Sequence, residues 1–133
     1  MRKIEHIGIA VQDIEASNKV FTKIFGKDSY KSERVESEGV ITSFFQIGES
    51  KIELVSATNS ESPISKYLQK NREGMHHIAL IVDDIEVALI FLKERNVNLV
   101  DSKPRIGAEG YKIAFIHPGS SGGVLIELCQ KEE

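Results

Sequence analysis

Residues 6–14 read His-Ile-Gly-Ile-Ala-Val-Gln-Asp-Ile, and residues 77–85 read His-Ile-Ala-Leu-Ile-Val-Asp-Asp-Ile. The second stretch begins 71 residues after the first and keeps the histidine, the apolar run and the Asp-Ile pair in place. Self-similarity within a chain indicates that it is built from repeated structural units. The sequence therefore predicts two related halves, each opening on a histidine.

A second pair of segments repeats in the same order. Ile52-Glu53-Leu54 returns as Ile126-Glu127-Leu128 at nearly the same spacing as the histidine segments. Each half is therefore expected to contain a histidine at its start and a glutamate in a late strand.

Local patterns supply the elements of the first half. The β-rich run at residues 3–11 predicts a strand. Asp13 suits the N-cap of the following helix, and Gly26 suits its stop. Three further strands are predicted at residues 29–36, 40–47 and 51–57.

The second half follows the same plan. Residues 76–82 predict a strand, and Asp84 suits the N-cap of the helix that comes next. Further strands are predicted at residues 98–100, 111–117 and 124–129.

The predicted fold class is α+β, with two tandem β-α-β-β-β modules related by a pseudo-two-fold and forming an open cupped sheet around a metal cleft. Module one spans about residues 3–58 and module two about 75–130, joined by a connecting segment at about 59–74. The length of 133 residues suits one domain over residues 1–133.

The repeated residues predict a metal site formed by His6, Glu53, His77 and Glu127. A two-fold relation would bring one histidine and one glutamate from each half towards a shared axis. A carboxylate among apolar strand neighbours is costly to bury unless it is paired or bound to a cation. Two imidazoles and two carboxylates suit a divalent transition metal.

Two other histidines, His76 and His117, are possible alternatives as metal ligands. His76 is the rival of His77, but the apolar alternation after His77 matches that after His6, so His76 is expected on the opposite face of the strand. His117 lies in a predicted turn and is expected to be structural or to face a substrate. A single histidine at a strand start is more often a hydrogen-bonded structural residue, so the recurrence carries the argument.

Composition narrows the class of protein. The net charge of −3 gives no support for a nucleic-acid or membrane partner. Cys129 is the one cysteine, so the sequence predicts no intrachain disulfide. The N-terminus has no signal-like apolar stretch, and a cytoplasmic location is expected.

These motifs resemble the vicinal-oxygen-chelate superfamily, which holds glyoxalase I, extradiol dioxygenases, bleomycin-resistance proteins and methylmalonyl-CoA epimerases. The similarity runs from residues 5–11 to residues 122–128, almost the whole chain. The more specific stretches are residues 61–68, 74–79 and 117–119, and the first of these and the Gly-Gly-Val-Leu-Ile-Glu ending resemble the epimerase branch.

The resemblance implies a function and a site. It implies interconversion of (R)- and (S)-methylmalonyl-CoA, an acyl-CoA substrate and a homodimer. His6, His77 and Glu127 carry over as metal ligands, and Glu53 takes the fourth position, where some members have Gln. Co²⁺ is the expected ion, with Ni²⁺, Mn²⁺ and Zn²⁺ as alternatives. Glu127 is also the candidate for one of the two acid/base groups that epimerisation needs.

The second acid/base group is a point of departure from the family. In one branch a glutamate stands three positions after the glycine of an acidic turn, and here that position is Thr42, a poor base. Another residue or a water would have to serve, and nothing in the sequence directs Glu36 or Glu38 to the metal. Candidate contacts for the CoA phosphates are Lys103, Arg105, Lys112 and the turn at residues 120–123.

Three alternative functions share the fold. A glyoxalase I-like lyase acting on a glutathione hemithioacetal would use the same four ligands, and the epimerase-like segments argue against it. An extradiol dioxygenase needs a two-histidine, one-carboxylate iron site and commonly a longer chain. A non-catalytic drug-sequestering protein typically lacks the metal ligands.

Overall fold

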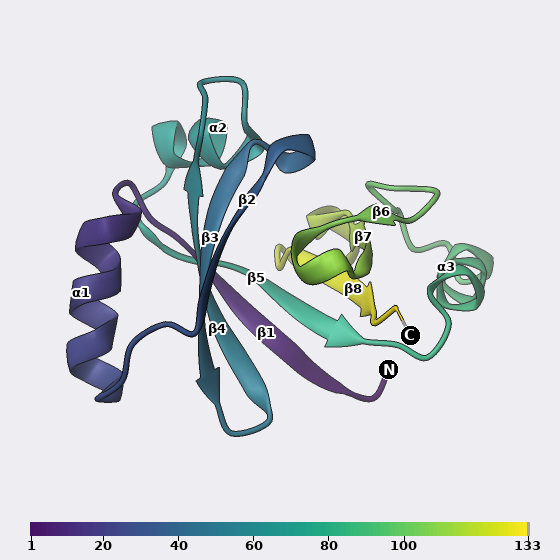
Figure 1. Ribbon diagram of the computed structural model, residues 1–133. Coiled ribbons are helices and arrows are strands. Elements are labelled where there is room, and N and C mark those ends of the chain that lie inside the picture. The colour runs from purple at the N-terminus through teal and green to yellow at the C-terminus, as the bar shows by residue number, and fades with distance from the viewer. Residues whose placement is uncertain (133) are drawn as a thin grey trace. The chain divides into compact units, whose positions relative to one another are not determined.

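The computed structural model describes residues 1–132, which divide into two compact units (Figure 1). One unit is residues 7–76; the other joins residues 1–6 to the described residues from 77 onward. The division passes through strands β1 (Lys3–Ala10) and β5 (Gly74–Ile81), which contribute to both units. The N-terminal residues of the chain thus belong with its second half.

The unit of residues 7–76 is a sheet with the strand order β2-β3-β4-β1. The strands β2, β3 and β4 are antiparallel, and Val11 donates its N–H to the Val55 carbonyl at 2.9 Å where β1 leaves the sheet. Its elements besides β1 are α1 (Ile14–Phe25), β2 (Lys31–Val35), β3 (Val40–Ile47), β4 (Ser50–Ala57) and α2 (Pro63–Lys70).

The helix α1 begins and ends where the sequence predicts. The Asp13 carboxylate accepts hydrogen bonds from the N–H groups of Glu15 and Ala16, and Gly26 closes the helix in the left-handed region at φ 72°. Phe25 packs its ring 5.2 Å from that of Phe45, centroid to centroid. The apolar face of α1 therefore covers one face of the sheet.

Phe45 anchors this packing, and its truncation is expected to be costly. It is fully buried between α1 and the sheet, whereas Ile47 on the same strand and face is 41% exposed. We expect Phe45→Ala to lower the free energy of unfolding by about 3–5 kcal/mol, because it removes a large buried side chain and leaves a cavity. Urea denaturation would measure this, with Ile47→Ala as the matched control. Similar losses in both variants would contradict the assignment of the core.

The other unit has the strand order β1-β5-β8-β7-β6, with β5 and β8 parallel and the later pairs antiparallel. The start of β1 lies beside β5, where Arg2 donates its N–H to the Ile81 carbonyl at 2.8 Å. Its remaining elements are α3 (Ile85–Glu94), β6 (Arg105–Ile106), β7 (Lys112–Ile116) and β8 (Ile126–Gln130).

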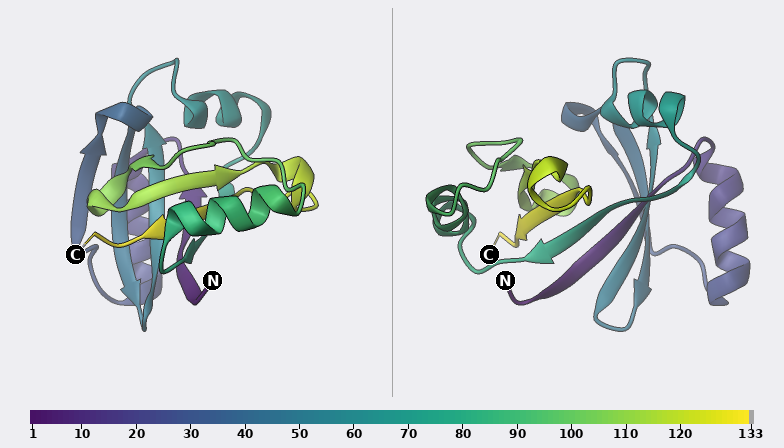
Figure 2. Two further views of the ribbon diagram at one scale, coloured as in Figure 1. Left: turned by 90° about the vertical axis from the view of Figure 1, so that its right-hand side faces the viewer. Right: turned by 180° about the vertical axis from the view of Figure 1, so that it is seen from behind.

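The sheet of this second unit has two different faces. Figure 2 shows α3 lying along β7 and β8, and its side chains Leu89 and Leu92 form a buried cluster with Leu128. Side chains alternate between faces along a strand, so Glu127 points away from α3. The face that carries Glu127 also buries Cys129. The α+β class and the β-α-β-β-β order of each half are confirmed.

The strand predicted at residues 98–100 is wrong as a full strand. Only Leu99 forms a bridge, to Ile116, and the paired edge strand is β6. The physical reason is the side chain of Asp101, whose carboxylate accepts the N–H of Phe115 at 2.8 Å and so replaces a backbone acceptor in the ladder. Pro104 then supplies no N–H of its own before the pairing resumes in β6.

Candidate metal centre

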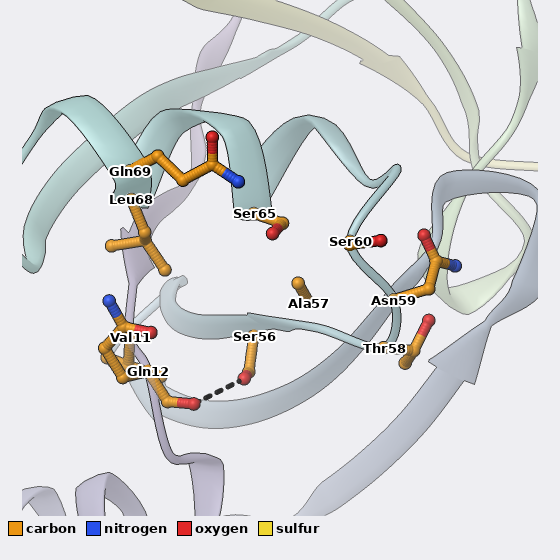
Figure 3. A pocket seen from close by; sticks show the side chains of 10 residues that line it. All are labelled: Val11, Gln12, Ser56, Ala57, Thr58, Asn59, Ser60, Ser65, Leu68 and Gln69. Atoms are coloured by element: carbon orange, nitrogen blue, oxygen red, sulfur yellow. Dashed lines mark hydrogen bonds between the residues drawn. The ribbon is translucent and has the colours of Figure 1, made fainter.

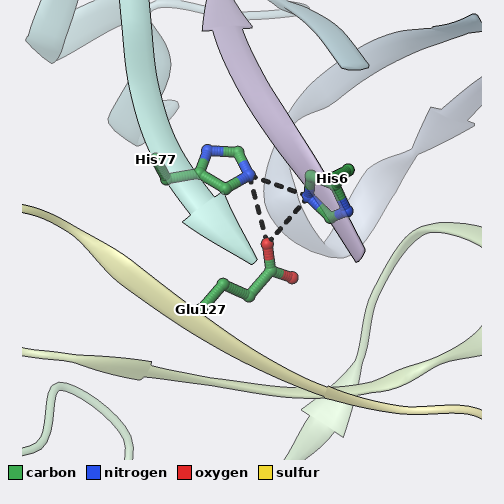
Figure 4. A group of neighbouring side chains, drawn as sticks. All are labelled: His6, His77 and Glu127. Carbon is green, nitrogen blue, oxygen red and sulfur yellow. Dashed lines mark hydrogen bonds and ion pairs between the residues drawn. The ribbon is translucent and has the colours of Figure 1, made fainter. Parts of the chain in front are cut away.

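Three polar side chains meet at one point in the second unit (Figure 4). His6 Nε2 lies 3.0 Å from His77 Nε2 and 3.2 Å from Glu127 Oε1. His77 Nε2 lies 3.1 Å from the same Glu127 oxygen. The three atoms therefore form a nearly equilateral triangle.

Strand pairing brings these residues together from distant parts of the chain. His77 lies in β5 and Glu127 in β8, and their strands pair in parallel with Ala79 opposite Glu127. His6 lies in β1, whose start runs beside β5. Three adjacent strands thus each supply one side chain, which a rigid sheet holds more firmly than a loop would.

The three side chains are buried, at 6% exposed for His6, 7% for His77 and 6% for Glu127. Burial by itself would raise the pKa of Glu127. The hydrogen bonds from His6 and His77, together with their positive charge when protonated, outweigh burial and hold that pKa well below its usual range. The carboxylate therefore stays ionised at neutral pH.

The triangle fits a metal ion. Ligand atoms that bind one ion at right angles and about 2.1 Å each stand about 3.0 Å apart, close to the separations between these three atoms. A set of two imidazole nitrogens and one carboxylate oxygen suits a divalent transition metal. Imidazole nitrogens that face each other and a carboxylate so closely thus indicate a divalent metal site.

Glu5 is a member of this neighbourhood that the sequence did not predict. Its Oε1 lies 3.0 Å from His6 Nδ1, and the residue is only 5% exposed. Neighbours in a strand point to opposite faces, so a strand pattern separates residues 5 and 6 rather than pairing them. The signal that could have found it is the acidic residue directly before the first histidine of the repeat.

Glu53, the fourth predicted ligand, lies in β4 of the other unit. It is 5% exposed and stands opposite Phe44 in the antiparallel pair with β3. A buried carboxylate needs a compensating partner. Its role as a metal ligand stays a prediction.

The two rival histidines occupy other surroundings. The ring of His76 packs edge-on against Tyr67, with centroids 4.7 Å apart. His117 caps a short turn, where its Nδ1 accepts the N–H of Gly119 at 3.0 Å. His77, not His76, is the one in the triangle, as the register of the repeat predicts.

Thr42 has a structural role. It is 1% exposed, and its hydroxyl donates to the Glu33 carbonyl at 3.2 Å. Glu36, a carboxylate near the same turn, is paired at 2.6 Å with the Nε of Arg34. A threonine hydroxyl is a poor base, and this one is buried against a backbone carbonyl.

The candidate anion contacts are largely engaged within the protein. Arg105 forms an ion pair with Asp101, and the Nζ of Lys112 lies 3.8 Å from Glu132 Oε1. In the turn after β7, the N–H groups of Ser120, Ser121 and Gly123 donate to carbonyls of the same turn. A phosphate would have to compete with these bonds.

A separate cavity of about 400 Å³ lies in the unit of residues 7–76, between α2 and the ends of β1 and β4 (Figure 3). Ser56 hydrogen-bonds the Gln12 carbonyl at its edge, at 3.2 Å. Its lining side chains are uncharged: Val11, Gln12, Ser56, Ala57, Thr58, Asn59, Ser60, Ser65, Leu68 and Gln69. It shares no residue with the His6–His77–Glu127 triangle.

Over residues 1–132, no helix is both long and apolar enough to span a membrane.

Known proteins match this chain along most of its length. Residues 5–115 match the family described as the glyoxalase/bleomycin resistance protein/dioxygenase superfamily. An ethylmalonyl-CoA/methylmalonyl-CoA epimerase from Cereibacter sphaeroides is 35% identical over 130 residues, covering 96% of this chain and 97% of that protein. A mitochondrial methylmalonyl-CoA epimerase from Bos taurus is 36% identical, covering 96% of this chain and 74% of the relative.

A solved structure matches as well. It is a variant of the Streptomyces coelicolor methylmalonyl-CoA epimerase in complex with 2-nitronate-propionyl-CoA, and it is 32% identical to this chain. The TM-score is 0.94, and the match covers 98% of this chain and 95% of that one.

Proposed function

This chain belongs to the glyoxalase/bleomycin resistance protein/dioxygenase superfamily, and we propose that within it the chain is a metal-dependent epimerase of (R)- and (S)-methylmalonyl-CoA. The resemblance to the epimerase branch predicted from the sequence is confirmed by relatives of that name at 35–39% identity. The named relatives support the epimerase activity, and the buried triangle of His6, His77 and Glu127 supports its metal dependence.

The reaction requires that a carbon acid be made to ionise. The substrate carbon lies between a thioester and a carboxylate, and its proton leaves only if the resulting enolate is stabilised. A divalent ion held by His6, His77 and Glu127 would supply Lewis-acid stabilisation of that negative charge. Burial of the three ligands keeps water away from the charge and strengthens the interaction.

The side chains of the site have separate roles in the proposed reaction. His6 and His77 present ring nitrogens, and Glu127 presents a carboxylate that its lowered pKa keeps ionised. Epimerisation needs proton exchange on both faces of the planar enolate and therefore two acid/base groups. We assign one of these roles to Glu127, as the resemblance implies. The hydroxyl of Thr42 is a poor base, so we assign the second role to another residue or a water.

The ion, the fourth ligand and the homodimer are proposed from the same resemblance. We propose Co²⁺ as the ion, with Ni²⁺, Mn²⁺ and Zn²⁺ as alternatives that accept the same mixed N/O ligands. Glu53 is proposed as the fourth ligand. A CoA thioester is the proposed substrate class, because solved relatives carry acyl-CoA ligands. A homodimer and a cytoplasmic location remain predictions from the sequence.

The test is hydrogen exchange at the α-carbon. Methylmalonyl-CoA is incubated with the protein in deuterated water, and loss of the α-proton is followed by NMR with Co²⁺ and then with a chelator. We expect exchange that depends on the metal, because the enolate needs Lewis-acid stabilisation. Folded protein that gives no exchange with any of the four ions would overturn the proposal. The glutathione hemithioacetal would then be the next substrate to test.

A further inference from the structure

Glu5 is a buried carboxylate that the proposed reaction does not use. Its side chain is 6% exposed and that of His6 is 8% exposed, and Glu5 Oε1 lies 3.0 Å from His6 Nδ1. Ionised carboxylates are costly to bury without a partner. The contact of Glu5 with His6 is therefore favoured, because it lowers the cost of burying the carboxylate.

The contact distinguishes the two nitrogens of the His6 ring. In neutral imidazole one nitrogen carries a proton and donates, and the other has a free lone pair and accepts. A carboxylate is only an acceptor, so the Nδ1 that faces Glu5 has to be the protonated nitrogen. The opposite tautomer would set a lone pair against the Glu5 oxygen and lose the hydrogen bond in a buried place.

The other nitrogen is thereby directed at the metal centre. His6 Nε2 is the atom that lies 3.0 Å from His77 Nε2 and 3.2 Å from Glu127 Oε1. A histidine that binds a metal through one nitrogen commonly donates its other N–H to a carboxylate, which fixes the ring and makes the ligand more basic. The arrangement of Glu5, His6 and the triangle has this form.

We propose that Glu5 is a positioning residue that, in the metal-loaded protein, keeps the proton of His6 on Nδ1 and thereby leaves the Nε2 lone pair for a divalent ion. The inference rests on the proposed metal site. Glu5 acts through His6 and is not itself assigned a contact with the ion or with the substrate.

The first experiment compares metal affinity in Glu5→Gln with that of the parent protein, by calorimetric titration with Zn²⁺. Glutamine keeps the shape of the side chain but removes its charge. We expect binding about 10–100-fold weaker, the usual cost of losing such a partner. Glu86→Gln, the same substitution on the exposed side of α3, is the matched control and should bind as the parent does. Equal affinity in Glu5→Gln and the parent would overturn the inference.

A second measurement does not depend on any variant folding. In the ¹⁵N-labelled, Zn²⁺-loaded parent, long-range ¹H–¹⁵N correlations report which His6 nitrogen carries the proton. We expect a protonated Nδ1 and a metal-bound Nε2, and a proton on Nε2 would overturn the inference. Failure of this inference can be distinguished from failure of the proposed function. A parent protein that binds no divalent ion overturns the proposed function as well. Normal binding with the wrong tautomer overturns only the role of Glu5.

Discussion

His77→Ala is expected to abolish tight divalent-metal binding, while His76→Ala leaves it nearly unchanged. The two histidines are adjacent in β5, yet their surroundings differ. His77 Nε2 lies 3.1 Å from Glu127 Oε1 and faces His6, whereas His76 packs against the ring of Tyr67. Because side chains alternate along a strand, a change at one position leaves the other face in place.

The measurement is metal content and affinity of the two variants after loading with Co²⁺. Loss of a direct ligand should weaken metal affinity by more than the roughly 10–100-fold lost when a hydrogen-bond partner of a ligand is removed. Circular dichroism would show that both variants retain the sheet. His76→Ala is a well-matched control, because the residue type, strand and substitution are the same. Equal metal content in both would mean that the triangle is not the binding site.

Glu127→Gln is expected to eliminate α-proton exchange and to weaken metal binding. The amide keeps the size of the side chain but removes the one negative charge among the three ligands. Glu127 accepts contacts from both histidines, and these hold its pKa well below the usual range, so the native group is anionic where the amide is neutral. Removing a positioned acid/base group usually costs about a hundred- to ten-thousand-fold in rate.

A companion variant separates the two proposed roles of Glu127. Glu127→Asp keeps the charge but shortens the reach, so it should retain part of the metal affinity that Glu127→Gln loses. The α-proton exchange assay and a Co²⁺ titration would be run on both variants, with Glu86→Gln as the charge-matched control. Exchange at the parent rate in Glu127→Gln would remove this residue from the mechanism.

The sequence was most informative where local chemistry decides the outcome. Asp13 and Asp84 cap their helices as predicted, each accepting two N–H groups of the first turn. A cap depends on a few consecutive residues, so it is visible without the fold. The strand boundaries at residues 98–106 could not be predicted in this way. Asp101 interrupts the pairing with β7 through a hydrogen bond from Phe115, 14 residues away.

The candidate site likewise combines residues that the sequence predicts with one that only the structure shows. The repeat selected His6, Glu53, His77 and Glu127, since side-chain direction in a strand follows from a period of two residues. The structure brings His6, His77 and Glu127 together. The sequence also chose between His76 and His77. It did not find Glu5, because its contact with His6 runs against the alternation that predicts opposite faces for neighbours.

By itself the sequence determined the β-α-β-β-β order of each half and the helix caps, and its four metal ligands, His6, Glu53, His77 and Glu127, stay a prediction. These depend on periodicity and short-range hydrogen bonding, which the chain carries locally. Only the tertiary structure decided that residues 1–6 belong with the second half, that the three ligand atoms lie within 4.8 Å of one another, and that Glu5 contacts His6. The contact of His6 with His77 joins positions 71 residues apart, and the contact of Glu5 with His6 goes against the strand alternation that separates neighbours.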